Sequence, residues 1–368
     1  MFVTWRLVCV AVITLAGSDV RATLGRPSVS LLGSGASFPS RLYVEWAAAF
    51  KAFRKDKVQL QMTYKSTGSG QGNAMTIDRR QEVHYAGSDL LLTNNTYRQV
   101  PDLQMLPTSA GAVVIIVNLP GIKTLKLTPE VLVGIYNGTY TLWSDPDLKS
   151  LNPDLDLPMK HIRVVVRSDT SGTTEIFTRA LSAFDTKWRD TFGWFSKGLN
   201  ESADPNLRWN SSAYWLSGRT SLGVSGVVTA VKYSISYVSL LATRHLGLTR
   251  CKLSNKAGRS LAPSLDAIRR VVKAGNGKFD TRFNADLVDS NGAQSYPIVA
   301  YTYLVIRMKT MKNCDSAKEL YRYIAWFTTN EEASYLCKEN GMIPLSKNAS
   351  ERIVRGKYRV LCERLIHS

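Results

Sequence analysis

The chain has 368 residues, of which 44% are hydrophobic, and it carries a formal net charge of +18. This length indicates two domains or one large domain, and the absence of low-complexity tracts and internal repeats excludes fibrous and solenoid architectures. The positive charge would attract anions such as phosphate, nucleic acid or membrane headgroups. Because lysine and arginine are spread along the chain without a basic block, the sequence does not favour nucleic-acid binding.

Residues 1–22 have the form of a secretory signal peptide. Arg6 precedes an apolar run from Leu7 to Ala16, and small residues follow that run. A short membrane anchor is the alternative, but the run is well under the ~20 residues that a membrane span needs. We therefore expect a secreted, extracellular protein, or a periplasmic one if the source is bacterial.

Cysteines and glycosylation sequons agree with a secreted protein. With Cys9 of the signal segment set aside, the remaining cysteines are Cys251, Cys314, Cys337 and Cys362. An even number in a secreted chain predicts disulfides, with three possible connectivities. Asn-x-Ser/Thr sequons begin at Asn94, Asn137, Asn200, Asn210 and Asn348. They favour a glycoprotein made in a eukaryotic secretory route.

The first third of the chain alternates between helix and strand. Residues 40–54 have apolar side chains at helical spacing, which predicts an amphipathic helix. Its buried face is expected to consist of Tyr43, Trp46, Ala47, Phe50 and Phe53. The pattern then predicts a strand over 57–66, a helix near 73–80, a strand from residue 83 that ends at Ser88-Asp89, and a buried strand over 110–120.

The same alternation continues to the end of the chain. Residues 128–138 predict a short helix with Thr128-Pro129 at its start, and 161–184 predict a strand, a loop and a helix. The inward side chains of the second helix are expected to be Ile176, Phe177, Ala180 and Leu181. Residues 296–307 predict a further strand, and 315–337 predict two helices. The sequence therefore predicts an α/β protein with largely parallel sheets.

Polar, glycine-rich segments stand where predicted strands end. They are GSGASFP (33–39), STGSGQG (66–72), GSD (87–89) and RSDTSGTT (167–174). In parallel sheets, ligands bind at the carboxyl ends of strands, and hydroxyls, helix-start N–H groups and an arginine favour an oxyanion. Each segment also has a purely structural interpretation: Ser37 as a helix cap, Asp89 as a turn residue, or Arg167 with Asp169 as a salt bridge.

These segments, together with residues 125–158 and 295–306, resemble the bacterial phosphate-binding proteins in order and approximate spacing. Those proteins are the receptors of phosphate ABC transporters and belong to the type II periplasmic binding proteins. The resemblance covers nearly all of the chain after the signal segment. It implies a two-lobed α/β fold with two hinge crossovers, inorganic phosphate as the ligand, and neither a cofactor nor a metal.

The resemblance also implies how the chain divides. Lobe one would comprise residues 28–115 plus 300–368, and lobe two would comprise 116–299. Phosphate would bridge the lobes and favour a closed form through contacts that exist only there. Because a bridge from Cys251 would cross the hinge and hinder closure, we expect one disulfide among Cys314, Cys337 and Cys362.

The binding residues of the family can be carried over position by position. They fall on Ser37, Phe38, Ser69, Asp89, Arg167, Ser171, Gly172 and Thr173. Most of these would donate hydrogen bonds to phosphate oxygens, with Asp169 orienting the guanidinium of Arg167. Asp89 would be the one acceptor, which suits phosphate because phosphate keeps a proton near neutral pH. Sulfate has no proton to donate, so it would bind roughly a thousandfold more weakly.

Departures from the family leave other functions open. Ser37 replaces a threonine, Gln71 stands in an otherwise small stretch, and Thr220-Ser221 replace a common Gly-Asn within 217–226. These changes allow a ligand-free adhesion or scaffold protein on the same fold.

A phosphate-ester hydrolase is a weaker alternative, with Ser171 or Ser69 as the nucleophile. None of His84, His161, His245 or His367 belongs to a recognisable catalytic motif. We therefore expect a monomeric, non-enzymatic receptor for phosphate, with any membrane transporter or receptor that it serves unidentified.

Overall fold

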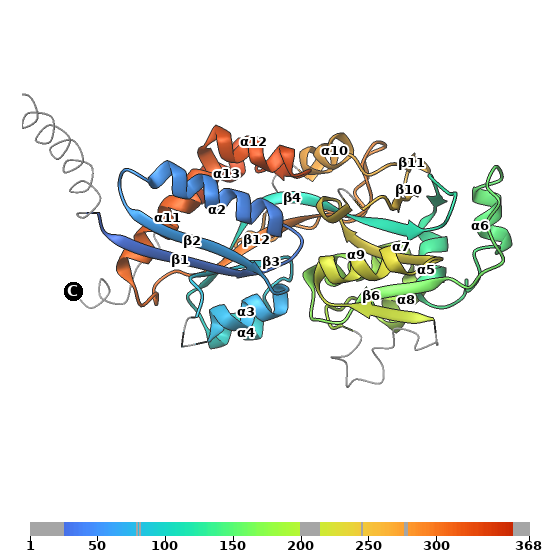
Figure 1. The fold of residues 1–368 in the computed structure, drawn as a ribbon, viewed down its shortest axis with the longest axis horizontal. Coiled ribbons are helices and arrows are strands. Elements are labelled where there is room, and N and C mark those ends of the chain that lie inside the picture. The colour runs from blue at the N-terminus through green and yellow to red at the C-terminus, as the bar shows by residue number, and fades with distance from the viewer. Residues whose placement is uncertain are drawn as a thin grey trace, which may run out of the picture.

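The structure is a computed structural model that describes residues 26–78, 80, 82–198, 214–243, 246–275 and 279–355. These residues form two lobes side by side, each with a sheet covered by helices (Figure 1). Within the described ranges, every helix is too short or too polar to span a bilayer. The predicted signal peptide lies outside them.

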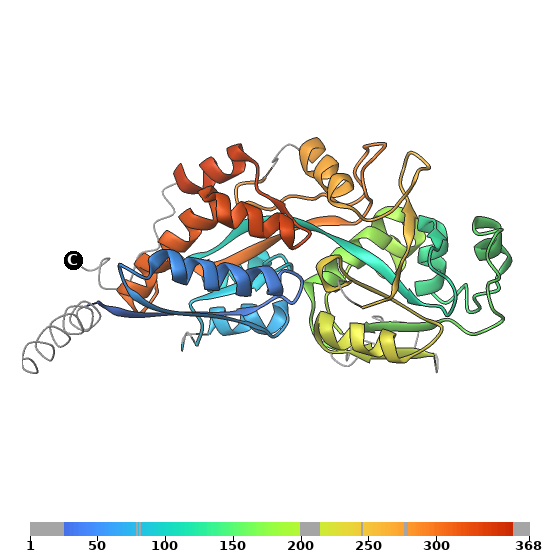
Figure 2. The ribbon, with the colours of Figure 1, turned by 45° about the horizontal axis from the view of Figure 1, so that its top comes forward.

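Strand β4 (Leu103–Asn118) joins the two lobes. It lies in the middle of a sheet with the order β2-β1-β3-β12-β4-β8-β6-β7. Its first part pairs with β12 (Val299–Arg307), and residues from Val113 onward pair with β8 (Ser234–Ser239). Figures 1 and 2 show β4 passing from one lobe into the other. The strand is buried along most of its length, because its long apolar run can be covered on both faces.

Lobe one contains the N-terminal elements and the last helices. Its further strands are β1 (Ser28–Gly35), β2 (Gln59–Ser66), β3 (Tyr85–Ser88) and β13 (Ile343–Pro344). Its helices are α2 (Ser40–Arg54), α3 (Ser69–Ile77), α4 (Asn94–Gln99), α11 (Cys314–Thr329), α12 (Glu331–Glu339) and α13 (Lys347–Arg355). Figure 1 shows α2 above β1 and β2 and α3 below them, so that both faces of these strands are covered.

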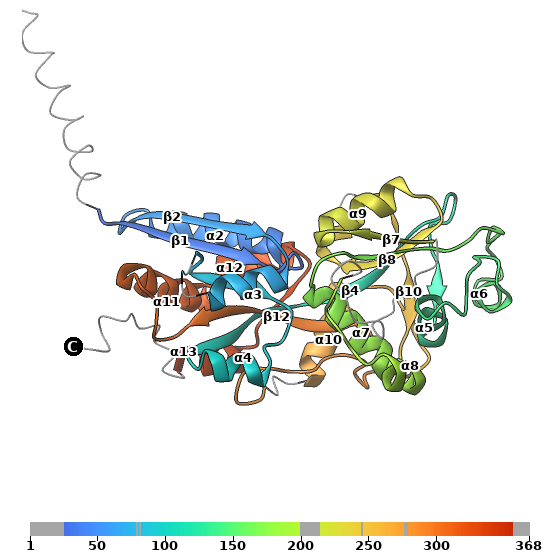
Figure 3. The same ribbon diagram turned by 90° about the horizontal axis from the view of Figure 1, so that it is seen from below.

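Lobe two is built from the middle of the chain. Its further strands are β6 (Arg163–Arg167), β7 (Trp215–Gly218) and β9 (Thr249–Arg250), with a small sheet of β5 (Lys126–Leu127), β10 (Lys252–Ser254) and β11 (Ser260–Leu261). Its helices are α5 (Pro129–Tyr136), α6 (Pro146–Leu151), α7 (Gly172–Phe184), α8 (Thr186–Thr191), α9 (Thr220–Ala230) and η1 (Leu241–Thr243). Helix α10 (Leu265–Gly275) contacts β13 and β4. In Figure 3, β7 and β8 lie between α9 and α7.

The α/β class is confirmed, but the sheet is mixed rather than largely parallel. β1 is parallel to β2 and β3, and β6 is parallel to β7 and β8. β12 runs antiparallel to β3 and β4, and β4 runs antiparallel to β8. The prediction failed for β4 and β12 because their pairing is set between distant parts of the chain. A local alternation of helix and strand does not encode it.

Several predicted boundaries also differ from the structure. α3 begins at Ser69 rather than near residue 73, because Gly68 has a φ of 95° and turns the chain directly into the helix. β4 begins at Leu103, before the predicted 110–120, because its first part pairs with β12. By contrast, β3 ends at Ser88 as predicted, where the hydroxyl of Ser88 bonds to the backbone of Leu90 in a turn.

The predicted helix at 40–54 is confirmed with one exception on its apolar face. Tyr43, Trp46, Ala47 and Phe50 are buried, whereas Phe53 is 58% exposed. Phe53 lies at the last turn of α2, where its ring stacks on the surface side of Phe50 at a centroid distance of 6.3 Å. The inward residues predicted for α7 are all buried, namely Ile176, Phe177, Ala180 and Leu181.

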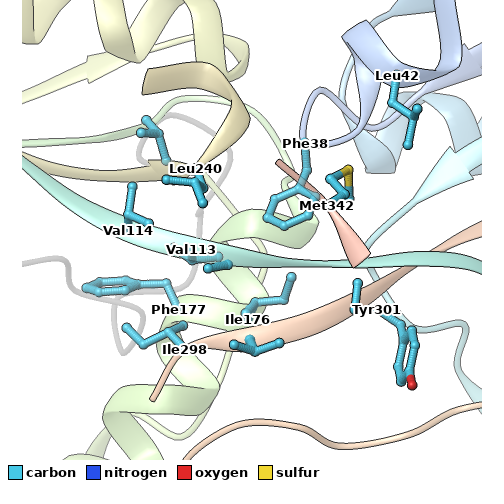
Figure 4. Close-up of a cluster of buried hydrophobic side chains, with 14 of the residues drawn as sticks. Phe38, Leu42, Val113, Val114, Ile176, Phe177, Leu240, Ile298, Tyr301 and Met342 are labelled. Carbon is cyan, nitrogen blue, oxygen red and sulfur yellow. The ribbon is translucent and has the colours of Figure 1, made fainter. Parts of the chain in front are cut away.

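Phe38 follows the first polar segment and belongs to an apolar cluster where the lobes meet. Figure 4 shows its ring beside Met342, near Val113 of β4 and Ile176 of α7. A Cβ on Gly111 would lie 2.8 Å from the Phe38 ring, so only a glycine lets the ring pack directly on β4. The cluster therefore holds the end of the first polar segment against the strand that joins the lobes.

The described cysteines narrow the disulfide prediction. Cys251 and Cys337 are free and buried, so Cys337 is excluded from the predicted bridge. Cys337 lies on α12 and is fully buried, beside the hydroxyl of Ser109. Among the three predicted cysteines, a bridge could then only join Cys314 to Cys362, which lies outside the described residues.

The contrast between two phenylalanines of α2 tests where the core of lobe one lies. Phe50→Ala should lower the free energy of unfolding by about 3–5 kcal/mol, because it opens a cavity under a fully buried ring. Phe53→Ala, one turn away on the same helix, should cost about 1 kcal/mol or less. Urea denaturation of both variants gives the two values, and equal losses would contradict this placement of the core.

Candidate functional site

The polar segments identified in the sequence meet between the two lobes. The Nη1 of Arg167 donates to the hydroxyl of Ser37 at 3.3 Å, which joins the first and the last segment. The backbone N–H of Gly70 donates to the carbonyl of Thr170 at 3.3 Å, which joins the second and the last. Asp89 of the third segment lies against Gly172 of the last. Residues far apart in the sequence thus form one interlobe site.

All of the predicted binding residues are buried in this site. They are Ser37, Phe38, Ser69, Asp89, Arg167, Ser171, Gly172 and Thr173. The first four come from lobe one, at the carboxyl ends of β1, β2 and β3, and the others follow β6 of lobe two. In lobe one β1 is parallel to β3, and in lobe two β6 is parallel to β7. The carboxyl ends of parallel strands lie at one edge of a sheet, and the two edges meet at the site.

Arg167 and Asp169 form a buried ion pair with two hydrogen bonds. Nε and Nη2 of Arg167 donate to the two carboxylate oxygens of Asp169 at 2.8 and 2.6 Å. The side chain of Arg167 is 2% exposed and that of Asp169 is 10% exposed. The backbone N–H of Thr220 also donates to Asp169, at 3.0 Å. With one edge of the guanidinium fixed in this way, Nη1 is directed at Ser37 and the site.

Asp89 is the buried carboxylate of the site. It is 4% exposed, and its Oδ1 has no hydrogen-bond partner among the described residues. Its backbone N–H donates to the hydroxyl of Ser69 at 3.2 Å, which fixes the start of the side chain. Burial raises the pKa of Asp89 to about 7, although the Thr302 hydroxyl and the charge of Arg167 lower it. Among the described residues, the hydroxyl of Thr302 beside Asp89 is likewise buried without a partner, so both atoms could bond to a ligand at this point.

The first turn of α7 supplies further donors. The hydroxyl of Ser171 accepts from the N–H of Thr174 at 3.3 Å and so caps the helix. The hydroxyl of Thr173 is 1% exposed and lacks a hydrogen-bond partner among the described residues. The start of a helix carries free N–H groups and a partial positive charge, which favour an anion. The hydroxyl of Thr173 and the carboxylate of Asp89 are thus both unsatisfied on the two sides of one site.

Glycines let the lobes approach each other at this point. A Cβ on Gly172 would lie 2.4 Å from the backbone carbon of Asp89 and 2.5 Å from the nitrogen of Leu90. A Cβ on Gly68, which also has a φ of 95°, would lie 2.5 Å from a carboxylate oxygen of Asp169. Neither position could hold a larger residue while the lobes are this close.

The structure also shows what the sequence-based site lacked. Ser37 is not a helix cap: Pro39 occupies that position of α2, and the hydroxyl of Ser37 contacts Ser221 and Arg167. Ser221 was not among the predicted residues, although it lies in the stretch flagged as a departure from the family. Thr302 of β12, beside Asp89, was also missed, because nothing in its local sequence distinguishes it from other strand residues.

A crevice leads from the site toward the surface. It has a volume of about 580 Å³, and Gly70, Thr170 and the exposed Trp194 are among the residues that line it. Glu175 lines it, and burial raises the pKa of this carboxyl to about 7. The carboxylate of Glu175 accepts from the N–H of Leu91 at 3.5 Å, another contact between the lobes.

The pKa of Asp89 gives a prediction about stability. The folded protein holds a proton on Asp89 up to about pH 7, whereas the unfolded chain releases it near pH 4. The contribution of Asp89 to the free energy of unfolding should therefore fall as the pH rises from about 4 to about 7. In buffers without phosphate or sulfate, Asp89→Asn should gain stability relative to the wild type across this window.

Denaturation at several pH values measures this difference. Asp266→Asn, at a side chain that is 78% exposed, is the control and should show no comparable trend. A difference between Asp89→Asn and the wild type that stays constant with pH would mean that Asp89 is not a strained, buried acid.

Comparison with known proteins places this architecture in a family. A family model described as the PBP superfamily domain matches residues 21–331. The phosphate-binding protein PstS of Haemophilus influenzae is 32% identical over 311 residues, covering 83% of this chain and 86% of that protein. The PstS protein of Methanocaldococcus jannaschii is 29% identical over 328 residues, covering 83% of this chain and 80% of that protein.

Solved structures agree on the fold. A phosphate-binding protein from Stenotrophomonas maltophilia has a TM-score of 0.67 at 21% identity, covering 89% of this chain and 93% of its own. A human phosphate-binding apolipoprotein has a TM-score of 0.70 at 20% identity, covering 88% and 93% of the two chains. The two-lobed fold, the matched family model and the PstS relatives lead to one conclusion: this chain is a member of the PBP superfamily, in the family of the PstS phosphate-binding proteins.

Proposed function

We propose that this protein is a secreted receptor that binds inorganic phosphate between its lobes and catalyses no reaction. The observation that carries the proposal is the buried Oδ1 of Asp89, which has no partner in the described part of the chain and faces a site otherwise rich in donors. A tetrahedral oxyanion that also carries a hydrogen satisfies both halves of such a site. The relatives named above are phosphate-binding proteins, which supports the same ligand.

The donors of the proposed site come from both lobes. From lobe one, we assign the hydroxyls of Ser37 and Ser69 and the N–H of Phe38. From lobe two, we assign Nη1 of Arg167, the hydroxyls of Ser171 and Thr173, and the N–H of Gly172. Asp169 orients the guanidinium of Arg167, because it accepts hydrogen bonds from two of its nitrogens and leaves Nη1 to donate to the anion. Together these groups supply positive charge and hydrogen bonds from several directions.

Asp89 provides the selectivity in this proposal. In ionised form, its free oxygen would accept the remaining proton of phosphate in a short hydrogen bond. Sulfate would place a lone pair there instead, and two acceptors facing each other in a buried site repel. Nearby Arg167 lowers the pKa of Asp89, and a bound phosphate proton would further favour its charged form.

Closure of the lobes completes the proposed mechanism. We propose that lobe one is 28–115 plus 300–368 and lobe two is 116–299, with β4 and the chain entering β12 as the two crossovers. The described state is closed in this sense, since Gly172 lies against Asp89. Because the site is buried when closed, phosphate must enter an open form, and its contacts to both lobes then favour the closed one.

A binding role also fits the surroundings of the two candidate nucleophiles. The hydroxyl of Ser69 accepts from the N–H of Asp89, and that of Ser171 accepts from the N–H of Thr174. Of the described histidines, His84 bonds to the backbone of Leu32 and the ring of His161 stacks on Tyr214, so neither activates these hydroxyls. The described residues contain no cluster of three groups suited to a metal ion.

Secretion is proposed from residues 1–22, and glycosylation and a disulfide would be compatible with it. The sequon residues Asn94, Asn137 and Asn348 are exposed and would be open to glycosylation, while Asn200 and Asn210 lie outside the described residues. A disulfide would join Cys314 to Cys362. We propose a monomer that delivers phosphate to a membrane transporter or receptor whose identity the chain does not specify.

Calorimetry with phosphate and sulfate tests the function. The phosphate-stripped protein should bind phosphate with a Kd of about 1 µM or tighter and bind sulfate roughly a thousandfold more weakly. In Asp89→Asn the ratio should fall to about tenfold, because an amide can donate to sulfate. Glu175→Gln, which neutralises another buried carboxyl near the site, should keep the ratio of the wild type.

Two results would reject the proposal in different ways. If the wild type binds no phosphate, the protein is not a phosphate receptor, and the ligand-free scaffold becomes the better interpretation. If Asp89→Asn discriminates as well as the wild type, phosphate binds but Asp89 does not recognise its proton.

A further inference from the structure

The turn that departs from the family, Arg219–Ser221, is attached to two residues of the site. The N–H of Thr220 donates to Asp169 at 3.0 Å. The N–H of Ser221 donates to the hydroxyl of Ser37 at 3.1 Å, and the two serine hydroxyls lie 2.9 Å apart. Ser37 belongs to lobe one and Ser221 to lobe two, so these bonds link the lobes beside the site. None of the sequence-based assignments included Ser221.

The hydrogen bonds at Ser37 determine what its hydroxyl can do. A serine hydroxyl has one proton to donate and two lone pairs that accept. Both lone pairs are taken, because the N–H of Ser221 and Nη1 of Arg167 donate to this oxygen. The hydroxyl of Ser37 can therefore only donate its own proton. Without an anion, the acceptor in reach is the hydroxyl oxygen of Ser221.

Binding of an anion would change the hydrogen bonding of the Ser221 hydroxyl. If Ser37 turns its proton to the anion, the hydroxyl of Ser221 loses the one hydrogen bond it makes among the described residues. Ser221 is 4% exposed, and a buried hydroxyl rarely stays without a partner. Because Ser37 already accepts two bonds, Ser221 cannot donate back to it. The anion beside Ser37 and Arg167 is the partner that remains in reach.

We propose that Ser221 is a further phosphate-binding residue, whose hydroxyl donates to the phosphate oxygen that Ser37 contacts. This inference rests on the proposed function and deepens it. The backbone supports the assignment, since Thr220 adopts a φ of 60°, unusual for a β-branched residue, and is held there by Asp169. The turn thus presents Ser221 from the first turn of α9, where the positive end of the helix dipole favours an anion.

Substitution of Ser221 with a matched control on the same helix tests the proposal. Ser221→Ala should weaken phosphate binding roughly ten- to a hundredfold, the loss expected for one hydrogen bond to a charged ligand. Ser221→Thr, which keeps the hydroxyl, should restore most of this loss. Ser225→Ala is the control, because Ser225 lies one turn further along α9, is 2% exposed and has an unpaired hydroxyl in the same cavity of about 350 Å³. It should bind phosphate like the wild type.

A second set of variants separates direct contact from support of Ser37. In a Ser37→Ala background, Ser221→Ala should still weaken binding several-fold if Ser221 touches phosphate itself. If Ser221 acts only through Ser37, the second substitution should have no further effect, which would overturn the proposal. Calorimetry with inorganic phosphate gives each affinity, and thermal unfolding verifies that the variants are folded.

The outcomes distinguish this inference from the function on which it rests. A wild type that binds no phosphate overturns both. A wild type that binds phosphate while Ser221→Ala binds equally well overturns only the role of Ser221, because water in the cavity next to Ser221 and Ser225 then satisfies the hydroxyl.

Discussion

Burying a carboxylate oxygen without a hydrogen-bond donor costs free energy, and in the site between the lobes this cost falls on Asp89. Asp89 is taken out of water by both lobes, which raises its pKa, and no described residue donates to its free oxygen. A protein gains nothing in stability from this arrangement. A ligand that brings a hydrogen to Oδ1 and acceptor oxygens to the surrounding donors offsets this cost while Asp89 stays ionised. In the proposed function, selectivity for a protonated anion follows from this one side chain.

The fold brings this carboxylate opposite the positive side of the site. β4 runs through both lobes and fixes their relation, while the apolar cluster around Phe38 packs on it. The buried pair of Arg167 and Asp169 adds little to stability by itself, because two charges must be removed from water. Its effect is geometric: Asp169 holds the guanidinium so that Nη1 faces Ser37. Gly172 then allows the start of α7 to reach the backbone of Asp89.

Local patterns predicted the elements well where one face is buried and the other is solvated. The helices at 40–54 and after Ser171 followed from spacing, and only Phe53 was misassigned, because spacing does not reveal where a helix leaves the core. The start of α3 was missed because the left-handed Gly68 turns straight into the helix. The antiparallel course of β4 and β12 depends on pairings between distant residues, which no local pattern specifies.

The residues of the candidate site also divide into those that the local sequence reveals and those that depend on contacts between distant parts of the chain. Its hydroxyls, glycines and charges could be located in the sequence because they follow strands whose ends meet in this class of fold. The family resemblance then gave each residue an expected role. Ser221 could not be found in this way, since its contact with Ser37 spans 184 positions and its stretch departs from the family. A departure from a family pattern beside a site is therefore a reason to inspect that stretch in the structure.

A crystal structure of the phosphate complex at high resolution would show whether Asp89 accepts the proton of bound phosphate. We expect one phosphate oxygen at about 2.5–2.7 Å from Oδ1 of Asp89, the distance of a hydrogen bond between a hydroxyl and a carboxylate. A phosphate whose oxygens all lie beyond about 3.5 Å from this carboxylate would contradict it.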